Sequence, residues 1–332
     1  MMDKKSIRIK PSLPLYLVTA VALVLLYLLV MQLDNQVYYS KILVLMLINI
    51  VLAVSLNVTV GCLGQITLGH AGFMSVGAYT AALVSKSMVT GSNIGLPQYM
   101  LALLCGGIVA GVVGIIVGIP ALRLKGDYLA IITLAFGEII RVLIEYFDFT
   151  GGGVGLSKIP RLSKASQVTI IFWLAIVCVV VMYVIMTSRH GRAVLAIRDD
   201  EIAAEASGVN TTYYKTFAFT LSAIFAGIAG GIYAHSQGIL QAKTFDFNYS
   251  INILVMVVLG GMGSFTGAIL SAIVLTILPE VLRGFNEYRM ISYAVVLILI
   301  MIFRPRGLLG RSEFSLRKLA RIFKKKGVNG HE

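Results

Sequence analysis

Residues 188–214 read SRHGRAVLAIRDDEIAAEASGVNTTYY and separate two long apolar runs of the chain. Apolar side chains recur in this segment at helical spacing, which predicts a short amphipathic helix with an apolar ridge on one side and charges on the other. The residues of this ridge are Leu195, Ile202, Ala206 and Val209. Such a helix needs a partner, so we interpret the segment as a docking element. The alternative is a solvated loop between two membrane spans.

The composition indicates a membrane protein. Apolar residues make up 58% of the 332 residues and charged residues only 13%, whereas soluble domains have about 25% charged residues. We therefore expect an all-α polytopic membrane protein. The formal net charge of +13 could indicate a nucleic-acid partner, but the basic residues crowd the termini and short loops without interleaved aromatic residues. The positive-inside rule accounts for this distribution, and we expect no nucleic-acid partner.

Ten apolar stretches are candidate transmembrane spans. The first follows several basic residues, as in a signal peptide, but it is long enough to span and no small-residue cleavage site follows it, so we expect a retained helix. Two stretches, 251–262 and 290–303, are shorter than the ~20 residues that cross a bilayer, so they must be extended, tilted or only partly crossing. The ten stretches are 15–31, 42–60, 66–88, 98–119, 127–147, 168–187, 215–237, 251–262, 265–281 and 290–303.

The charge distribution predicts the orientation of the chain. Ten spans place both termini on one side of the membrane, and both termini are basic, so we expect both in the cytoplasm. The segment 188–214 then faces the cytoplasm and the uncharged stretch 90–98 faces outward. We expect one transmembrane domain over 1–310 and a basic cytoplasmic tail over 311–332. Five basic residues run against the rule, because this topology places them outside: Lys158, Arg161, Lys164, Arg283 and Arg289.

Several of the 33 glycines lie four residues from another small residue. This spacing lets helix backbones approach closely inside a membrane, so it predicts helix-packing faces and no catalytic role. The small residues with this spacing are Gly107 and Gly111, Gly114 and Gly118, and Ala223, Gly227 and Gly231.

Two glycine-rich interruptions, GCLGQ at 61–65 and GGMGS at 260–264, each follow an apolar run and hint at an internal repeat. Unwound backbone is tolerated in a membrane only where it is buried in protein or lines a water-filled cavity, so matching breaks in two halves of a chain indicate a transport path. Tight turns at the cytoplasmic face are an equally good interpretation. The candidate break residues are Gly61, Gly64, Gln65, Gly260, Gly261 and Gly263.

The span 127–147 contains ionisable residues that can share one helix face, because Glu138 and Arg141 are three residues apart and Arg141 and Glu145 are four apart. An ionised side chain at mid-bilayer costs at least ~2.5–3 kcal/mol, so an internal pair or a water-filled neighbour is expected. We consider a structural ion pair near the outer end and a pair that lines the transport path. His70, near the first break, is either a path residue or a hydrogen-bonding partner between helices.

The motifs of several enzyme classes are missing from the chain. No G-x-x-x-x-G-K-[ST], H-E-x-x-H or G-x-S-x-G pattern occurs, which argues against a Walker A nucleotide site, a zinc protease and a serine hydrolase. The three cysteines are widely spaced in apolar context, so we interpret them as small core residues. We expect no catalytic residue, no cofactor and no metal site, and therefore no enzyme.

Seven stretches of the chain resemble permease subunits of bacterial branched-chain amino acid ABC importers. The resemblance runs from about residue 45 to 310 and is closer to the LivM type than to the LivH type. The stretches are SLNVTVGCLGQITLGHAGF at 55–73, VGAYTAAL at 76–83, LRLKGDYLAIITLAFGEIIR at 122–141, TGGGVGL at 150–156, GRAVLAIRDDEIAAEASG at 191–208, VLGGMGS at 258–264 and RPRGLL at 304–309.

The resemblance implies an assembly in the bacterial inner membrane. It would contain a second, LivH-type permease subunit, two cytoplasmic ATP-binding subunits and an extracytoplasmic solute-binding protein, and this chain would form half of the path for ATP-driven uptake of leucine, isoleucine and valine. The resemblance also implies that residues 191–208 couple to the ATPase, although they lack the spacing of the E-A-A-x-x-x-G loop of many importer permeases. The implied coupling residues are Arg192, Arg198, Asp199, Asp200, Glu201, Glu205 and Gly208.

Two other functions stay open from the sequence. A related importer could carry urea, short amides or another amino acid, because the binding protein supplies much of the selectivity in such systems. An ion-coupled secondary transporter should instead have acids at the midplane of several helices, and only Glu138 and Glu145 are available here. This shortage favours an external source of energy.

Overall fold

The structure is a computed structural model that describes residues 37–288 except positions 90, 125 and 163, together with isolated positions beyond residue 290. The predicted span 15–31 and the predicted tail 311–332 lie outside the described residues, as does most of the span 290–303. The chain divides after Leu43 into two units. Of the first unit, only the opening residues of one helix are described. All contacts discussed below lie within the second unit, which begins at Val44.

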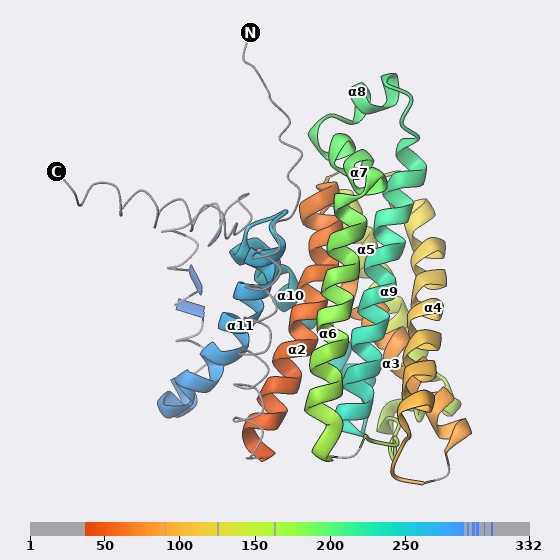
Figure 1. The fold of residues 1–332 in the computed structure, drawn as a ribbon, viewed down its shortest axis with the longest axis vertical. Helices are drawn as coiled ribbons and strands as arrows, with labels where there is room; N and C mark the ends of the chain where they lie inside the picture. Colours follow the sequence, from red (N-terminus) through yellow and green to blue (C-terminus); the bar gives the residue numbers. More distant parts are fainter. Residues whose placement is uncertain are drawn as a thin grey trace, which may run out of the picture. The chain divides into compact units, whose positions relative to one another are not determined.

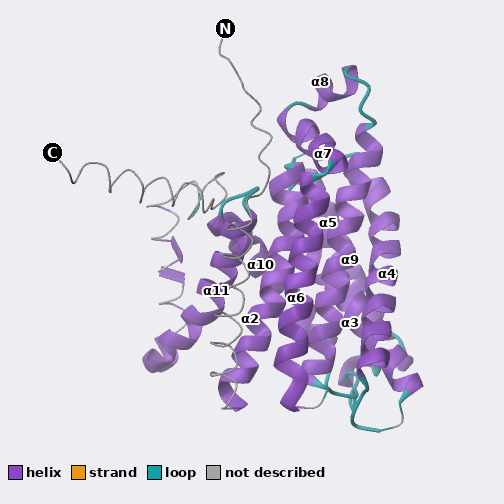
Figure 2. Cartoon of the chain, viewed as in Figure 1, coloured by secondary structure: helices purple, strands orange, loops and turns teal. Residues whose placement is uncertain are grey.

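The described residues form helices joined by turns, and no strand occurs among them (Figures 1 and 2). Five of the helices are long and apolar enough to cross a membrane. The α-helices are α2 (Val37–Asn57), α3 (His70–Met88), α4 (Leu96–Ala121), α5 (Asp127–Tyr146), α6 (Lys164–Thr187), α7 (Arg189–Asp199), α8 (Glu201–Ala206), α9 (Thr211–Gln237), α10 (Phe247–Gly260) and α11 (Phe265–Val281). A π-helical turn, η1 (Val58–Leu63), extends α2, and 3-10 turns are η2 (Asp148–Thr150), η3 (Gly152–Val154), η4 (Ala242–Phe245) and η5 (Leu282–Tyr288).

Most of the predicted spans between residues 42 and 281 match a helix to within a few residues. The span predicted over 66–88 is wrong at its start, because residues 64–69 are not helical and α3 begins only at His70. The short span predicted over 251–262 corresponds to α10, whose 14 residues rise only about 21 Å. A hydrocarbon core of about 30 Å is too thick for such a helix, so α10 can only cross part of it. The total of ten spans and the location of the termini stay predictions.

Helix α9 packs against both α3 and α4, and glycines make these contacts close (Figure 1). A Cβ added to Gly114 would lie 2.6 Å from Cβ of Ala223, and one added to Gly227 would lie 2.4 Å from Cβ of Ala110. A Cβ on Gly77 of α3 would lie 2.2 Å from the backbone of Gly227. The predicted role of the small residues in helix packing is therefore confirmed.

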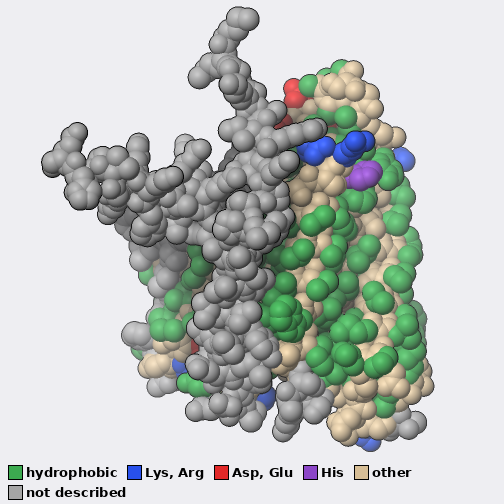
Figure 3. Space-filling model, viewed as in Figure 1, with side chains coloured by type: hydrophobic (Ala, Val, Ile, Leu, Met, Phe, Trp, Pro, Cys, Tyr) green, Lys and Arg blue, Asp and Glu red, His purple; other side chains and the backbone are tan. Residues whose placement is uncertain are grey.

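The outer faces of α4 and α6 carry large exposed apolar side chains. Figure 3 shows hydrophobic side chains spread along the flank of the helices, whereas Lys and Arg side chains lie near the two ends, several of them at the end that carries α7. An apolar surface this extensive is unusual on a soluble monomer and fits contact with lipid. Its residues include Leu104, Ile108, Val112, Ile116 and Ile119 on α4, and Trp173, Val177, Val180 and Val184 on α6.

Helix α9 separates the two segments to which the sequence assigns opposite sides of the membrane. At its start, Lys215 pairs with Glu201 of α8. At its end, the carbonyl of Gln237 accepts a hydrogen bond from Arg161, whose backbone in turn bonds Ser92 and Ile94. The 27 residues of α9 rise about 40 Å. The segment 188–214 and the loop before α4 therefore lie at opposite ends of one membrane-length helix.

This arrangement predicts the outcome of cysteine labelling in intact cells. In a background without native cysteines, Ser92→Cys should react with a membrane-impermeant maleimide, whereas Ser207→Cys should react only after the membrane is opened. Both serines are exposed, so a missing signal cannot reflect burial in the protein. Labelling of Ser207→Cys in sealed cells would overturn the predicted orientation.

Candidate functional site: a docking segment joined to two helix ends

The segment 188–214 forms two helices and not the single amphipathic helix predicted. Asp200 has extended backbone angles and ends α7, and its carboxylate caps α8 by accepting a hydrogen bond from the backbone N–H of Ala203 at 3.0 Å. The predicted apolar ridge is also wrong, since Ile202 is 79% exposed. The interruption at Asp200 changes the helical phase. The positions that are buried instead are Gly191, Val194 and Ile197 on α7 and Ala204 on α8.

Helix α7 lies against the end of α6 and against η1. Gly191 makes the first contact possible, because a Cβ at this position would lie 2.0 Å from the carbonyl oxygen of Met186. Any larger residue would push α7 away from α6. The helix is thus fixed to the bundle along one face, while its other face is open to solvent.

The three acids predicted to contact an ATPase all have partners within the chain. Asp199 accepts from the guanidinium of Arg198 at 3.1 Å, and Asp200 caps α8. Glu201 accepts from the ammonium of Lys215 at 2.6 Å, and the Lys215 side chain is only 6% exposed. These acids therefore shape the segment itself. Asp199 and Asp200 are nevertheless exposed and accessible to a partner.

The other predicted coupling residues lie on the open side of the segment. Arg192 is exposed and donates to the carbonyl of Thr187 at 3.2 Å. Glu205 is exposed on α8. Gly208 ends this helix with a φ of +84°, which favours glycine, and nothing lies within 4 Å of the Cβ it lacks. All three can be reached by a docked protein.

The two glycine-rich breaks lie at helix ends that meet one another. The first helix, α2 continued by η1, ends at Leu63, followed by Gly64 with a φ of +79°. Helix α10 ends at Gly260, and Gly263 in the next turn has a φ of +91°. The side-chain oxygen of Asn57 accepts a hydrogen bond from the backbone N–H of Gly263 at 2.9 Å. A Cβ on Gly61 would lie 2.2 Å from that same nitrogen.

The remaining glycines of the second break serve the turn and the packing of its two helices. Gly260 contacts Gly267 of α11 so closely that a Cβ would lie 2.5 Å from the carbonyl of Gly267. Gly261 follows α10 with a φ of +105°, a value that side chains rarely adopt. Both glycine-rich stretches thus lie at helix ends, and their place beside a transport path stays a prediction.

Arg198 of α7 reaches both helix ends. Its Nη1 donates to the carbonyl of Gly61 at 3.0 Å, while Nε and Nη2 face the carboxylate of Asp199. A Cβ on Gly64 would lie 2.7 Å from Cγ of Arg198, and one on Gly263 would lie 3.2 Å from Nη1. The sequence assigned the docking segment and the breaks to separate groups. The structure brings them together at Arg198.

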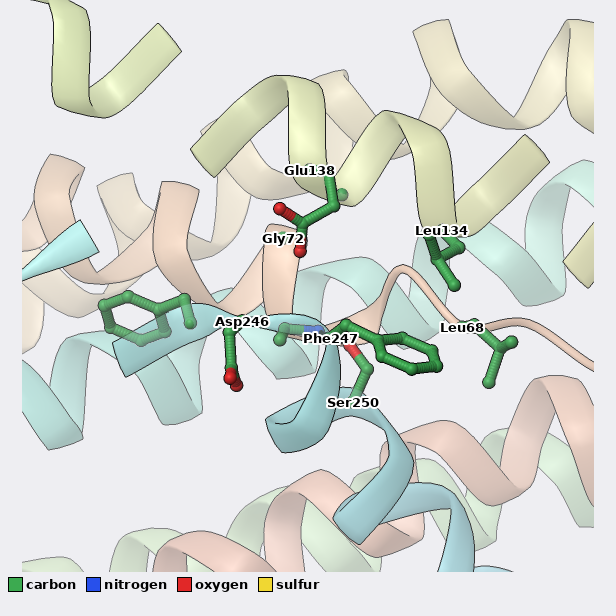
Figure 4. Close-up of a pocket in the computed structure, with 10 residues that line it drawn as sticks. Leu68, Gly72, Leu134, Glu138, Asp246, Phe247 and Ser250 are labelled. Atoms are coloured by element: carbon green, nitrogen blue, oxygen red, sulfur yellow. Dashed lines mark hydrogen bonds between the residues drawn. The ribbon is translucent and has the colours of Figure 1, made fainter. Parts of the chain in front are cut away.

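A second polar region lies where residues 64–69, α3, α5 and the start of α10 surround a small cavity that is partly open to solvent (Figure 4). In Figure 4, Glu138 and Leu134 project from α5, opposite Phe247, Leu68 and Ser250. Asp246 also lines the cavity and caps α10 by accepting from the N–H of Tyr249 at 2.9 Å. In Figure 4 the Asp246 carboxylate points away from Glu138, so the cavity combines the single carboxylate of Glu138 with apolar walls.

The predicted ion pairs of α5 are present. Nε of Arg141 lies 2.7 Å from Oε2 of Glu138, and its Nη1 lies 3.3 Å from Oε2 of Glu145. All three side chains are partly exposed, and Glu138 faces the cavity. The sequence left open whether this pair is structural or lines the path. The pair of Glu138 and Arg141 lies at the cavity wall, which is compatible with both interpretations.

Two other candidate path residues do not line this cavity. His70 is buried, and its Nε2 lies 2.9 Å from the hydroxyl oxygen of Ser55. Its contact joins α3 to α2, as expected of a hydrogen-bonding partner between helices. The backbone N–H of Gln65 donates to the carbonyl of Thr59 at 3.1 Å, which closes the end of η1.

Sequence reasoning missed two residues of these regions, Lys215 and Asp246. Asp is a preferred N-cap residue, and Asp246 directly precedes a short apolar stretch. This pattern could have located the start of α10. Lys215 gives no comparable signal, because its pairing with Glu201 depends on how α8 folds back on α9. Among the described residues, no group of His, Cys, Asp and Glu could hold a metal ion.

Comparison with known proteins adds independent information. Residues 38–303 match the family described as branched-chain amino acid transport system / permease component. The high-affinity branched-chain amino acid transport system permease protein LivM of Salmonella typhimurium is 39% identical over 79% of this chain and 68% of its own length. The corresponding protein named LivH of Escherichia coli is 23% identical over 79% of this chain and 91% of its own length. The solved structure of PsaBC from Streptococcus pneumoniae in complex with Fab has a TM-score of 0.44, with 13% identity, over 81% of this chain and 92% of that chain.

The helices and these relatives define a multi-pass helical protein of the inner membrane. The chain belongs to the family of permease components of branched-chain amino acid transport systems. The resemblance to LivM-type permeases that the sequence motifs indicate is confirmed.

Proposed function

We propose that this chain is the LivM-type permease subunit of an ABC importer and forms half of the path for ATP-driven uptake of leucine, isoleucine and valine. The observation that carries this proposal is the 39% identity to a LivM permease over 79% of the chain. The presence of both LivM and LivH proteins among the relatives supports a LivH-type chain as the second permease. ATP hydrolysis would fall to two separate subunits, since the chain has no Walker A motif.

We infer that α7 and α8 form the surface on which an ATP-binding subunit docks. The open face of α7, its exposed charges and its attachment to α6 and η1 support this role. A segment that is firmly attached on one face can pass a displacement to the bundle, whereas a loose loop would absorb it. The basic tail over 311–332 is proposed to lie on the same side.

The cavity beside Glu138 is our candidate for part of the solute path. Two discontinuities meet there, namely the unwound residues 64–69 and the start of the short helix α10. In transporters, interrupted helices commonly surround the solute near the middle of the membrane. The carboxylate of Glu138 can attract an α-ammonium group, while Leu68, Leu134 and Phe247 offer contacts to an aliphatic side chain.

Reconstitution into proteoliposomes tests the proposed function. The chain is combined with a LivH-type permease, two ATP-binding subunits and a solute-binding protein, and entry of radiolabelled leucine is measured with each component omitted in turn. We expect leucine uptake only with all components and with ATP on the side of the segment 188–214. The binding protein should be required because it presents the solute and favours the transport-competent state.

Two outcomes would change the proposal. Competition by urea, a short amide or a different amino acid, with no competition by isoleucine or valine, would assign the importer another solute. Sustained accumulation of leucine by this chain alone, driven by a sodium or proton gradient, would replace the importer with a secondary transporter.

A further inference from the structure

Arg198 occupies a position that docking alone does not explain. Its side chain is only 22% exposed and points back toward the bundle, whereas Asp199 beside it is 68% exposed. The hydrogen bond from Arg198 to Gly61 joins residues 137 positions apart in sequence. An arginine whose only role was to contact an ATPase would present its guanidinium to solvent.

The carbonyl that Arg198 contacts belongs to a helix end. The last carbonyls of a helix lack partners within the helix, and a cation near them interacts favourably with the helix dipole. Gly61 lies in the π-helical turn η1, whose end is completed by the bond from the N–H of Gln65 to the carbonyl of Thr59. Arg198 therefore acts as a cap on the α2–η1 helix, although it belongs to α7.

The same guanidinium also lies beside the second break. The missing side chain of Gly263 leaves room for Nη1, and Asn57 fixes the backbone of Gly263 to the helix that Arg198 caps. The planar guanidinium can donate in two directions at once, toward the Gly61 carbonyl and toward Asp199. A displacement of α7 must therefore either move both helix ends or break this bond.

We propose that Arg198 is a positioning residue that transmits movement of α7 to the helix ends at Gly61 and Gly263 and so couples ATP hydrolysis to opening of the path. This inference rests on the proposed function as an ABC importer. It assigns the transmission to one hydrogen-bonded side chain, not to the docking surface as a whole. Asp199 holds the guanidinium in the orientation that reaches Gly61.

The experiment measures leucine uptake and ATP hydrolysis of the complete importer in proteoliposomes. In Arg198→Ala, the amount of leucine moved per ATP should fall at least about tenfold, as expected for the loss of one charge-assisted hydrogen bond. Basal ATP hydrolysis should persist, because the docking surface is intact, whereas its stimulation by the binding protein should fall, because that signal must cross the same contact. Arg198→Lys should recover part of the leucine-to-ATP ratio, because an ammonium can still donate to the Gly61 carbonyl. The recovery should be incomplete, because an ammonium cannot also keep the two-nitrogen contact with Asp199.

Arg123→Ala is the matched control, because it removes an exposed arginine from the turn between α4 and α5 and should leave the ratio unchanged. If Arg198→Ala does not assemble, the same measurement is made on Asp199→Asn, which weakens the contact that orients the guanidinium of Arg198. We then expect a smaller fall of the leucine-to-ATP ratio. An unchanged leucine-to-ATP ratio in the assembled variant would overturn the proposal. A parent importer that transports no leucine with ATP would instead refute the proposed function, and this inference with it.

Discussion

Gly77→Ala should strongly destabilise the protein, because it places a methyl group between two helix backbones. A Cβ at Gly77 would lie 2.2 Å from both Cα and the carbonyl oxygen of Gly227, so no flexible side chain can move aside. Helices α3 and α9 would have to separate. Overpacking in a well-packed core typically costs about 1–3 kcal/mol and occasionally more, and we expect a value at the upper end. The measurement is the thermal midpoint of the purified chain in detergent.

Gly284→Ala provides the control for this substitution. Gly284 is exposed in η5, its φ is not positive, and nothing lies within 4 Å of an added Cβ. The same chemical change should therefore leave the thermal midpoint at the parent value. If Gly77→Ala unfolds at the same temperature as the parent protein, the close crossing of α3 and α9 is not as described.

The membrane-length helices could be predicted from sequence because their cause is local. A helix in lipid satisfies its own backbone hydrogen bonds, so an apolar run of sufficient length is enough to predict it. Helices α4 and α9 were predicted from such runs. The small residues where they cross were predicted from their four-residue spacing, which is also a local pattern. Even the ends of the glycine-rich breaks could be located, since φ values such as that of Gly64 favour glycine.

Residues 64–69 could not be predicted, because their conformation depends on tertiary partners. They contain Ile66 and Leu68 and lead directly into α3, yet they are unwound, and the N–H of Leu68 is satisfied by the hydroxyl of Thr133 on α5 at 3.0 Å. The start of α3 is held in the same way, with the N–H of Ala71 donating to Ser250 at 3.0 Å. Nothing in the local sequence identifies these partners.

The segment 188–214 is helical, as the sequence predicted, but it is not one continuous helix, and its docking role stays a proposal. Spacing of apolar residues suggested one continuous helix, but the hydrogen bond that the Asp200 carboxylate accepts from Ala203 begins a new helix and shifts the buried face. The Asp200 cap is a sequence signal that competes with periodicity, and here it prevails. The contact of Arg198 with Gly61 has no local signature at all, so only the fold could bring the two predicted groups together.

The second large effect concerns the ion pair between α8 and α9. In Glu201→Ala, the ammonium of Lys215 would lose its carboxylate partner at 2.6 Å while its side chain stays only 6% exposed. Removing one partner of a buried ion pair typically costs about 3–5 kcal/mol. Because the Glu201 side chain is 32% exposed, water can enter more easily, and we expect a loss at the lower end. The thermal midpoint in detergent should fall accordingly.

Combining this change with Lys215→Met identifies its cause. Methionine keeps an unbranched apolar side chain without a charge, so Glu201→Ala with Lys215→Met should recover most of the stability lost in Glu201→Ala. Glu205→Ala, an exposed position on the same helix, should have almost no effect on the midpoint. If Glu201→Ala and Glu205→Ala are equally mild, the pair does not hold α8 against α9. The attachment of the docking segment would then depend on the buried face of α7 and on Arg198 alone.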